Sequence, residues 1–110
     1  IMFKVIERLF GGGNDEEIAE LIGKGAVIID VRTPFEYSRG HVPGSVNIPL
    51  DSIEKNLKKI KKYNQPIITC CRSGARSGAA ASTLKANGVE AFNGGSWQNV
   101  QQSIGLQKRI

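Results

Sequence analysis

The sequence has few cysteines, histidines and aromatic residues, and each shortage excludes a class of protein. Among its 110 residues there are two cysteines and one histidine, His41. Adjacent cysteines do not form a disulfide framework, and with one histidine they do not supply the four ligands of a zinc site. Aromatic residues make up only 6% of the chain, whereas nucleic-acid-binding surfaces interleave them with basic residues. We therefore expect no metal and no nucleic-acid partner.

Long apolar runs are also missing. No stretch approaches the roughly 18 consecutive apolar residues of a membrane-spanning helix, so we expect no transmembrane segment. Near the start, Lys4, Glu7 and Arg8 interrupt the apolar stretch that a signal peptide requires. Together with the shortage of cysteines, this pattern predicts a reducing, cytoplasmic setting.

The net charge of +5 is concentrated in two places. Five lysines accompany two acidic residues between positions 51 and 62, and Lys108 and Arg109 add two further positive charges. The remaining charges cancel, so no basic stripe runs along the chain. The lysine-rich segment is typical of a solvated helix face, with docking of a protein partner as the alternative.

The apolar pattern predicts one α/β domain with a mostly parallel sheet. Continuous apolar runs at 26–29 and 66–70 are typical of strands buried on both faces, and shorter strands are predicted at 46–48 and 89–92. Helical patterns cover residues 15–22, 50–61, 76–87 and 96–103, and a turn or short helix begins at 33. Strands alternate with helices, which favours the α/β class.

We predict that the domain occupies residues 15–103. Residues 1–14 form an amphipathic segment before it, because apolar side chains recur at helical spacing over 2–10 and three glycines follow. Packing on the domain is its simpler role, and docking to a partner or a membrane surface is the alternative. Residues 104–110 form a basic tail.

The segment that carries the candidate chemistry follows the second buried strand. Its residues are Cys71, Arg72, Ser73, Gly74, Ala75, Arg76 and Ser77. In open α/β sheets, ligands bind outside the carboxyl ends of the strands. Small residues let the backbone N–H groups of such a loop point inward and bind an anion, assisted by the positive end of the next helix. With Arg72 and Arg76, these donors favour a thiolate at Cys71, which makes it a nucleophile.

The two cysteines receive different predictions. A free cysteine is usually a small buried hydrophobic residue, but the loop around Cys71 favours the nucleophile. Cys70 ends the predicted strand, so its side chain faces the opposite way, and we expect it to be inert packing.

Several motifs, taken together and in order, resemble the rhodanese family of sulfurtransferases. Residues 71–77 look like the family's active-site loop, 29–37 and 40–49 are similar to its first signature, and 94–97 match its glycine pair and tryptophan. The resemblance covers roughly residues 15–100. It implies a three-layer α/β domain whose mostly parallel central sheet has about five strands flanked by helices.

The resemblance also implies a reaction. Cys71 would accept a sulfane sulfur from thiosulfate or a persulfide donor and pass it to cyanide or a thiol. Backbone N–H groups of residues 72–76 would hold the persulfide anion, and Arg72 and Arg76 would attract the donor. The chemistry needs no metal or organic cofactor, and a thioredoxin-like protein would suit as a protein acceptor.

Two alternative functions are open. Cysteine phosphatases and arsenate reductases have an arginine six positions after the cysteine, but Arg76 follows Cys71 by five. The shorter loop suits one sulfur atom better than a phosphate. Rhodanese-like domains also occur as non-catalytic binding or regulatory modules, which usually lack the cysteine. The presence of Cys71 favours an enzyme.

The remaining motif residues are predicted to support the site. Asp30 should form hydrogen bonds near it, and Arg32 and Glu36, four residues apart, are predicted to form an ion pair. His41 lies in a turn rich in glycine and proline, where a structural role is favoured over a general base. Trp97 should cover a wall of the pocket or pack in the core.

Overall fold

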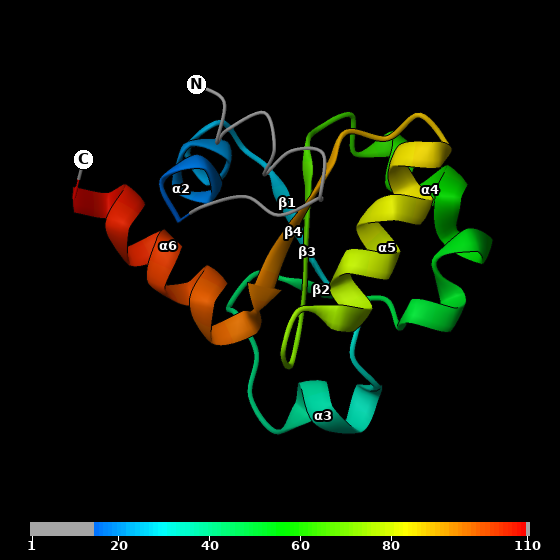
Figure 1. Ribbon diagram of the computed structural model, residues 1–110, viewed down its shortest axis with the longest axis horizontal. Helices are drawn as coiled ribbons and strands as arrows, with labels where there is room; N and C mark the ends of the chain where they lie inside the picture. Colours follow the sequence, from blue (N-terminus) through cyan, green and yellow to red (C-terminus); the bar gives the residue numbers. More distant parts are fainter. Residues whose placement is uncertain (1–14, 110) are drawn as a thin grey trace.

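The computed structural model describes residues 15–109, which build a central parallel sheet with helices on both faces (Figure 1). The strands are β1 (Val27–Asp30), β2 (Val46–Asn47), β3 (Ile67–Cys71) and β4 (Ala91–Ser96). They lie in the order β2-β1-β3-β4, and every pair is parallel. About five strands are predicted, whereas residues 15–109 form four, because no other described segment is extended and paired in the sheet.

Helices cover the sheet in two layers. On one face lie α2 (Asp15–Gly23) and α6 (Trp97–Arg109), on the other α4 (Leu57–Lys62) and α5 (Ala75–Ala86). Side chains along a strand alternate between the layers: Ile68 packs in the cluster with α2 and α6, and Ile67 packs with α5. The three-layer α/β class is therefore confirmed. The short helix α3 (Pro34–Ser38) lies beyond the carboxyl ends of the strands (Figure 1).

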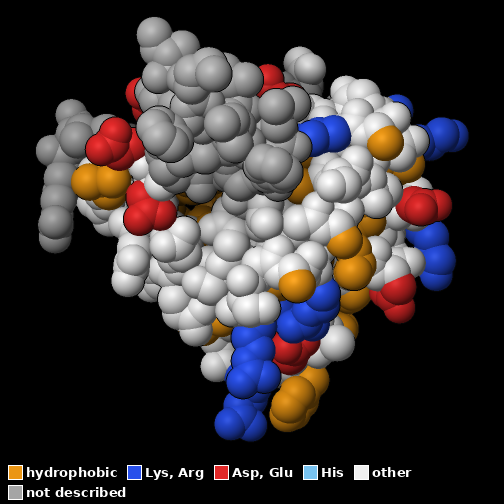
Figure 2. Space-filling model, in the orientation of Figure 1, with side chains coloured by type: hydrophobic (Ala, Val, Ile, Leu, Met, Phe, Trp, Pro, Cys, Tyr) orange, Lys and Arg blue, Asp and Glu red, His pale blue; other side chains and the backbone are white. Residues whose placement is uncertain are grey.

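The helix predicted over residues 50–61 is broken into three pieces. Two 3₁₀ turns, η1 (Leu50–Ser52) and η2 (Glu54–Asn56), precede α4. The side chain of Asn56 donates to the Ser52 carbonyl over 2.8 Å, and this is the oxygen that an α-helix would pair with the Asn56 N–H. Such local bonds compete with helical ones. The lysines of this segment are exposed on the edge of the molecule where α4 lies (Figure 2).

The C-terminal part departs from the prediction at two points. Gly94 and Gly95, predicted to turn the chain, lie inside β4, where an added Cβ at Gly94 would come within 2.6 Å of Val100 Cγ2. This glycine therefore permits a close approach of α6. That helix continues to Arg109 instead of ending at Ser103, so most of the predicted tail is helical.

Two predictions about the organisation of the chain are left untested by the described residues. The helix predicted over 2–10 lies outside the described residues, and the domain boundaries stay a prediction. Within residues 15–109, no helix is long and apolar enough to cross a membrane.

Candidate active site

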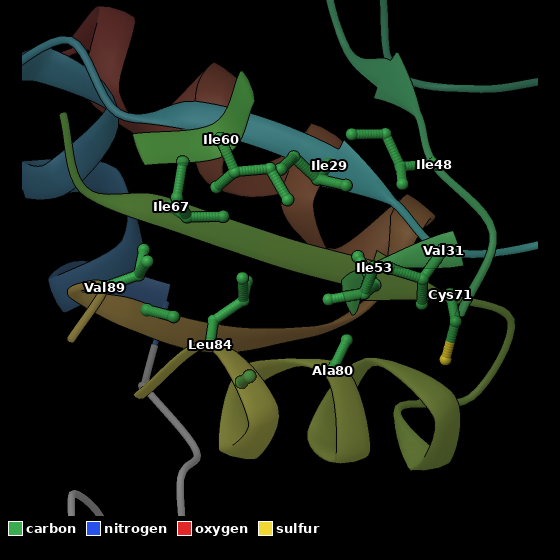
Figure 3. Close-up of a cluster of buried hydrophobic side chains, with 12 residues drawn as sticks. Ile29, Val31, Ile48, Ile53, Ile60, Ile67, Cys71, Ala80, Leu84 and Val89 are labelled. Carbon is green, nitrogen blue, oxygen red and sulfur yellow. The ribbon is translucent and has the colours of Figure 1, made fainter. Parts of the chain in front are cut away.

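Cys71 is the last residue of β3 and opens the loop that leads into α5. Its side chain points toward the first turn of α5 (Figure 3). Cys70 belongs to the cluster on the opposite face of the sheet. Both cysteines are free and buried. The opposed orientation predicted for the pair is confirmed.

The loop supplies hydrogen bonds to the sulfur of Cys71. The Gly74 N–H donates to Sγ over 3.0 Å, and the Ser77 hydroxyl oxygen lies 3.3 Å from Sγ. Gly74 adopts a φ of +106°, a conformation open to glycine and strained for other residues. This conformation aims its N–H into the loop.

The two cysteines have opposite pKa shifts. Burial opposes ionisation of Cys71, but hydrogen bonds from the Ser77 hydroxyl and from backbone N–H groups of the loop outweigh it, so its pKa is lowered. Burial raises the pKa of Cys70, and the nearby Asp30 carboxylate raises it further. Cys71 therefore ionises more readily than an ordinary cysteine, whereas the thiolate is strongly disfavoured at Cys70.

The two arginines of the loop lie in different environments. Arg72 is exposed, and no ion pair with another described residue engages it. Arg76 instead forms a bidentate ion pair with Glu36 of α3, with Nη1–Oε1 at 2.7 Å and Nη2–Oε2 at 3.0 Å. This bond lowers the pKa of Glu36 to about 2. The pair ties α3 to the start of α5, where Figure 2 shows basic and acidic side chains side by side.

The predicted ion pair between Arg32 and Glu36 is wrong. Arg32 turns inward and pairs with Asp30, with Nη2–Oδ2 at 2.7 Å and Nε–Oδ1 at 2.9 Å, and both residues are buried. Glu36 is engaged by Arg76 and also caps α3, because its side chain accepts from the Thr33 N–H. The contact between Arg32 and Glu36 is a hydrogen bond from Nη1 to the Glu36 backbone oxygen, at 3.3 Å.

The Asp30–Arg32 pair braces the segment that precedes α3 and the turn that follows it. Arg32 Nη2 donates to the Gly40 carbonyl over 2.7 Å, and its guanidinium lies 5.2 Å from the ring centroid of Trp97. Trp97 is half-buried against the cluster beneath α2 and α6. Asp30 thus forms the local hydrogen bonds predicted for it.

His41 also has structural partners. Its ring stacks on Tyr37 with centroids 3.7 Å apart, and Nδ1 lies 2.7 Å from the Tyr37 carbonyl oxygen. Tyr37 in turn donates from its hydroxyl to the Ser45 carbonyl. These contacts hold the turn after α3.

Asn93 also contacts the loop, although no motif in the sequence predicts it there. Located in β4 beside β3, it accepts from the Ser77 hydroxyl over 2.7 Å and donates to the Gly74 carbonyl over 3.1 Å. The available signal was a polar residue within a strand, directly before the glycine pair. Asn93 pairs with Thr69 of β3, two residues before Cys71, so it lies near the loop.

The surroundings of the loop include a hollow but no metal cluster. Within residues 15–109, no group of three or more His, Cys, Asp or Glu side chains could hold a metal ion. A hollow of about 360 Å³ lies beside Arg76, bounded by Val31, Pro34 and Leu50 among others.

Comparisons with known proteins agree with this geometry. A family model described as Rhodanese-like domain matches residues 14–102. Over 69 residues, the chain is 41% identical to the uncharacterized protein YqhL of Bacillus subtilis, covering 62% of this chain and 54% of that protein. It is 40% identical over 72 residues to the thiosulfate sulfurtransferase GlpE of Pseudoalteromonas translucida, covering 64% of this chain and 68% of that one.

A solved structure is also similar. The crystal structure of a rhodanese-like domain protein from Staphylococcus aureus superposes with a TM-score of 0.62 at 34% identity, covering 69% of this chain and 74% of that one. The chain thus spans about half the length of the Bacillus protein and about two-thirds of the Pseudoalteromonas one.

Proposed function

The chain belongs to the rhodanese-like domain family, and from that premise we propose that it is a sulfurtransferase that carries a sulfane sulfur on Cys71. Relatives described as thiosulfate sulfurtransferases support this chemistry at the level of the family. The observation that carries the proposal is the sulfur of Cys71, which accepts the Gly74 N–H and has a lowered pKa. A thiol used only for packing, such as Cys70, has a raised pKa instead.

The proposed first step loads the cysteine. The Cys71 thiolate attacks the outer sulfur of thiosulfate, a new S–S bond forms, and the old S–S bond breaks with its electron pair leaving on sulfite. In the second step an acceptor, cyanide or a thiol, attacks the outer sulfur of the persulfide and the electron pair returns to Sγ. The charges balance in both steps, and no redox cofactor takes part.

The charge around the loop suits an anionic donor. Inward-facing N–H groups stabilise negative charge on the outer sulfur, and exposed Arg72 is free to attract the donor. Arg76 is held by Glu36, so its proposed contribution is to fix the loop and to moderate the local charge. A protein thiol, such as that of a thioredoxin-like protein, and a reducing cytoplasmic setting are part of the proposal.

The proposal is tested by thiocyanate formation from thiosulfate and cyanide. The intact chain should turn over, Cys71→Ser should lose activity entirely, and Cys70→Ser should keep most of it. Cys70 is the matched control because it is the adjacent residue, is buried and points into the other layer. Comparable turnover by the intact chain and by Cys71→Ser would refute the proposal.

A further inference from the structure

The hydroxyl of Ser77 has more acceptors within reach than it has protons. Its oxygen lies 2.7 Å from Asn93 Oδ1, 3.3 Å from Cys71 Sγ and 3.5 Å from the Gly95 carbonyl oxygen. A hydroxyl carries one proton and donates to one acceptor at a time. The side chain is fully buried, so water does not donate a hydrogen bond to the acceptors that the Ser77 proton leaves unpaired.

Asn93 is held in one orientation by its other partners. Its Nδ2 donates to the Gly74 carbonyl over 3.1 Å, and its Oδ1 accepts the Gly95 N–H over 2.9 Å. The amide oxygen therefore faces Ser77, and it keeps a donor from Gly95 even when the Ser77 proton turns away. Neither position of that proton leaves Asn93 Oδ1 without a hydrogen bond.

The direction of the chain of hydrogen bonds depends on the charge of the sulfur. When Cys71 is a thiol, its S–H donates to the Ser77 oxygen, and the Ser77 proton donates to Asn93. When Cys71 is a thiolate, the sulfur has no proton to give and is the stronger acceptor, because hydrogen bonds to charged groups are the stronger ones. The Ser77 proton then turns to Sγ.

We propose that the Ser77 hydroxyl is a two-position switch between Cys71 and Asn93, with Asn93 as its positioning residue. This inference rests on the proposed sulfur transfer for its role in the reaction. In the persulfide, Sγ is a neutral bridging atom and the hydroxyl donates to Asn93. During release, the acceptor bonds to the outer sulfur, the S–S bond breaks, and its electron pair goes to Sγ. The hydroxyl turns to that charge as it forms, and no proton is transferred between residues.

The switch predicts opposite effects for its two residues on the thiolate fraction of Cys71. Ser77→Ala removes a donor to the thiolate, so the thiolate fraction below the pKa should fall about tenfold. Asn93→Ala removes the competing acceptor, so the fraction should rise by about threefold to tenfold. The Gly74 carbonyl keeps its bond from the Gly78 N–H, at 2.9 Å, in the Asn93 variant.

The test is a double-mutant cycle on the free protein. Alkylation of Cys71 by iodoacetamide is followed against pH in Cys70→Ser, alone and with Ser77→Ala, Asn93→Ala or both. The switch predicts that Asn93→Ala has its effect only when Ser77 is present. Equal shifts with and without Ser77, or no shift from Asn93→Ala, would overturn it.

Two further measurements keep the test decisive. Asn93→Asp adds a negative charge beside the hydroxyl and competes more strongly for its proton, so it should lower the thiolate fraction. If Asn93→Ala does not fold, Asn93→Asp is compared with and without Ser77→Ala, because the added charge by itself also disfavours the thiolate. A fall of equal size in both backgrounds, or no fall in either, would overturn the switch. Since alkylation needs no sulfur donor, coupling without thiocyanate formation refutes the proposed function alone. Thiocyanate formation without coupling refutes the switch alone.

Discussion

Replacing Gly74 by alanine tests how much one backbone N–H contributes to the thiolate. A Cβ at this position would meet nothing closer than Gly95 Cα, at 3.5 Å, so space is sufficient. The φ of +106° is the difficulty, and holding an alanine there costs about 1–3 kcal/mol. At roughly 4 °C per kcal/mol for a domain of this size, Tm should fall by about 4–12 °C.

The thiol should respond as well. Relief of the strain turns the Gly74 N–H away from Sγ, which it now contacts at 3.0 Å. Hydrogen bonds to charged groups contribute about 1.5–3 kcal/mol, so the pKa of Cys71 should rise and its alkylation rate below that pKa should fall about tenfold to a hundredfold. The alkylation profile would therefore move to higher pH, and urea unfolding measures the loss of stability.

Gly88→Ala is the matched control for this variant. Gly88 has a φ of +82°, nothing lies within 4 Å of an added Cβ, and the residue follows the opposite end of α5. It should lose stability through the same kind of strain while leaving the thiol unchanged. If both variants lose stability and neither shifts the alkylation profile, the Gly74 N–H does not stabilise the thiolate.

Three further predictions concern the charges around the loop. Glu36→Gln releases Arg76 toward the donor, so the KM for thiosulfate should fall several-fold in steady-state kinetics, and an unchanged KM would contradict that reasoning. Asp30→Ala leaves the buried Arg32 charge unpaired, so urea unfolding should show a loss of about 3–5 kcal/mol, and a loss below about 1 kcal/mol would contradict it. An NMR titration should find the Glu36 carboxyl pKa at about 2, returning toward about 4.3 in Arg76→Ala. Because this pKa is lowered, the carboxylate's contribution to stability is complete above about pH 4.3 and is lost as the pH falls toward about 2.

The sequence predicts the two inner strands and the position of Cys71 because these depend on local patterns. Apolar runs mark β1 and β3, both of which lie inside the sheet. The alternation of side chains along a strand separates Cys70 from Cys71. Glycine and small residues after β3 indicate the loop, and the Gly74 φ and its N–H contact agree with that expectation.

Residue pairings across the fold were beyond the reach of local patterns. Spacing suggests that Arg32 pairs with Glu36, but Glu36 pairs with Arg76 of α5, which lies 40 residues later in the chain. Asn93 reaches Ser77 only because β4 lies next to β3 in register. Such contacts depend on tertiary position, and no pattern of neighbouring residues encodes them.

Mass spectrometry of the intact chain after incubation with thiosulfate shows whether Cys71 carries the transferred sulfur. We expect a gain of one sulfur atom, localised to Cys71 by peptide mapping and removed by cyanide. The gain should be absent from Cys71→Ser and present in Cys70→Ser. A sulfur located on Cys70, or no gain on either cysteine, would rule out sulfur transfer through Cys71.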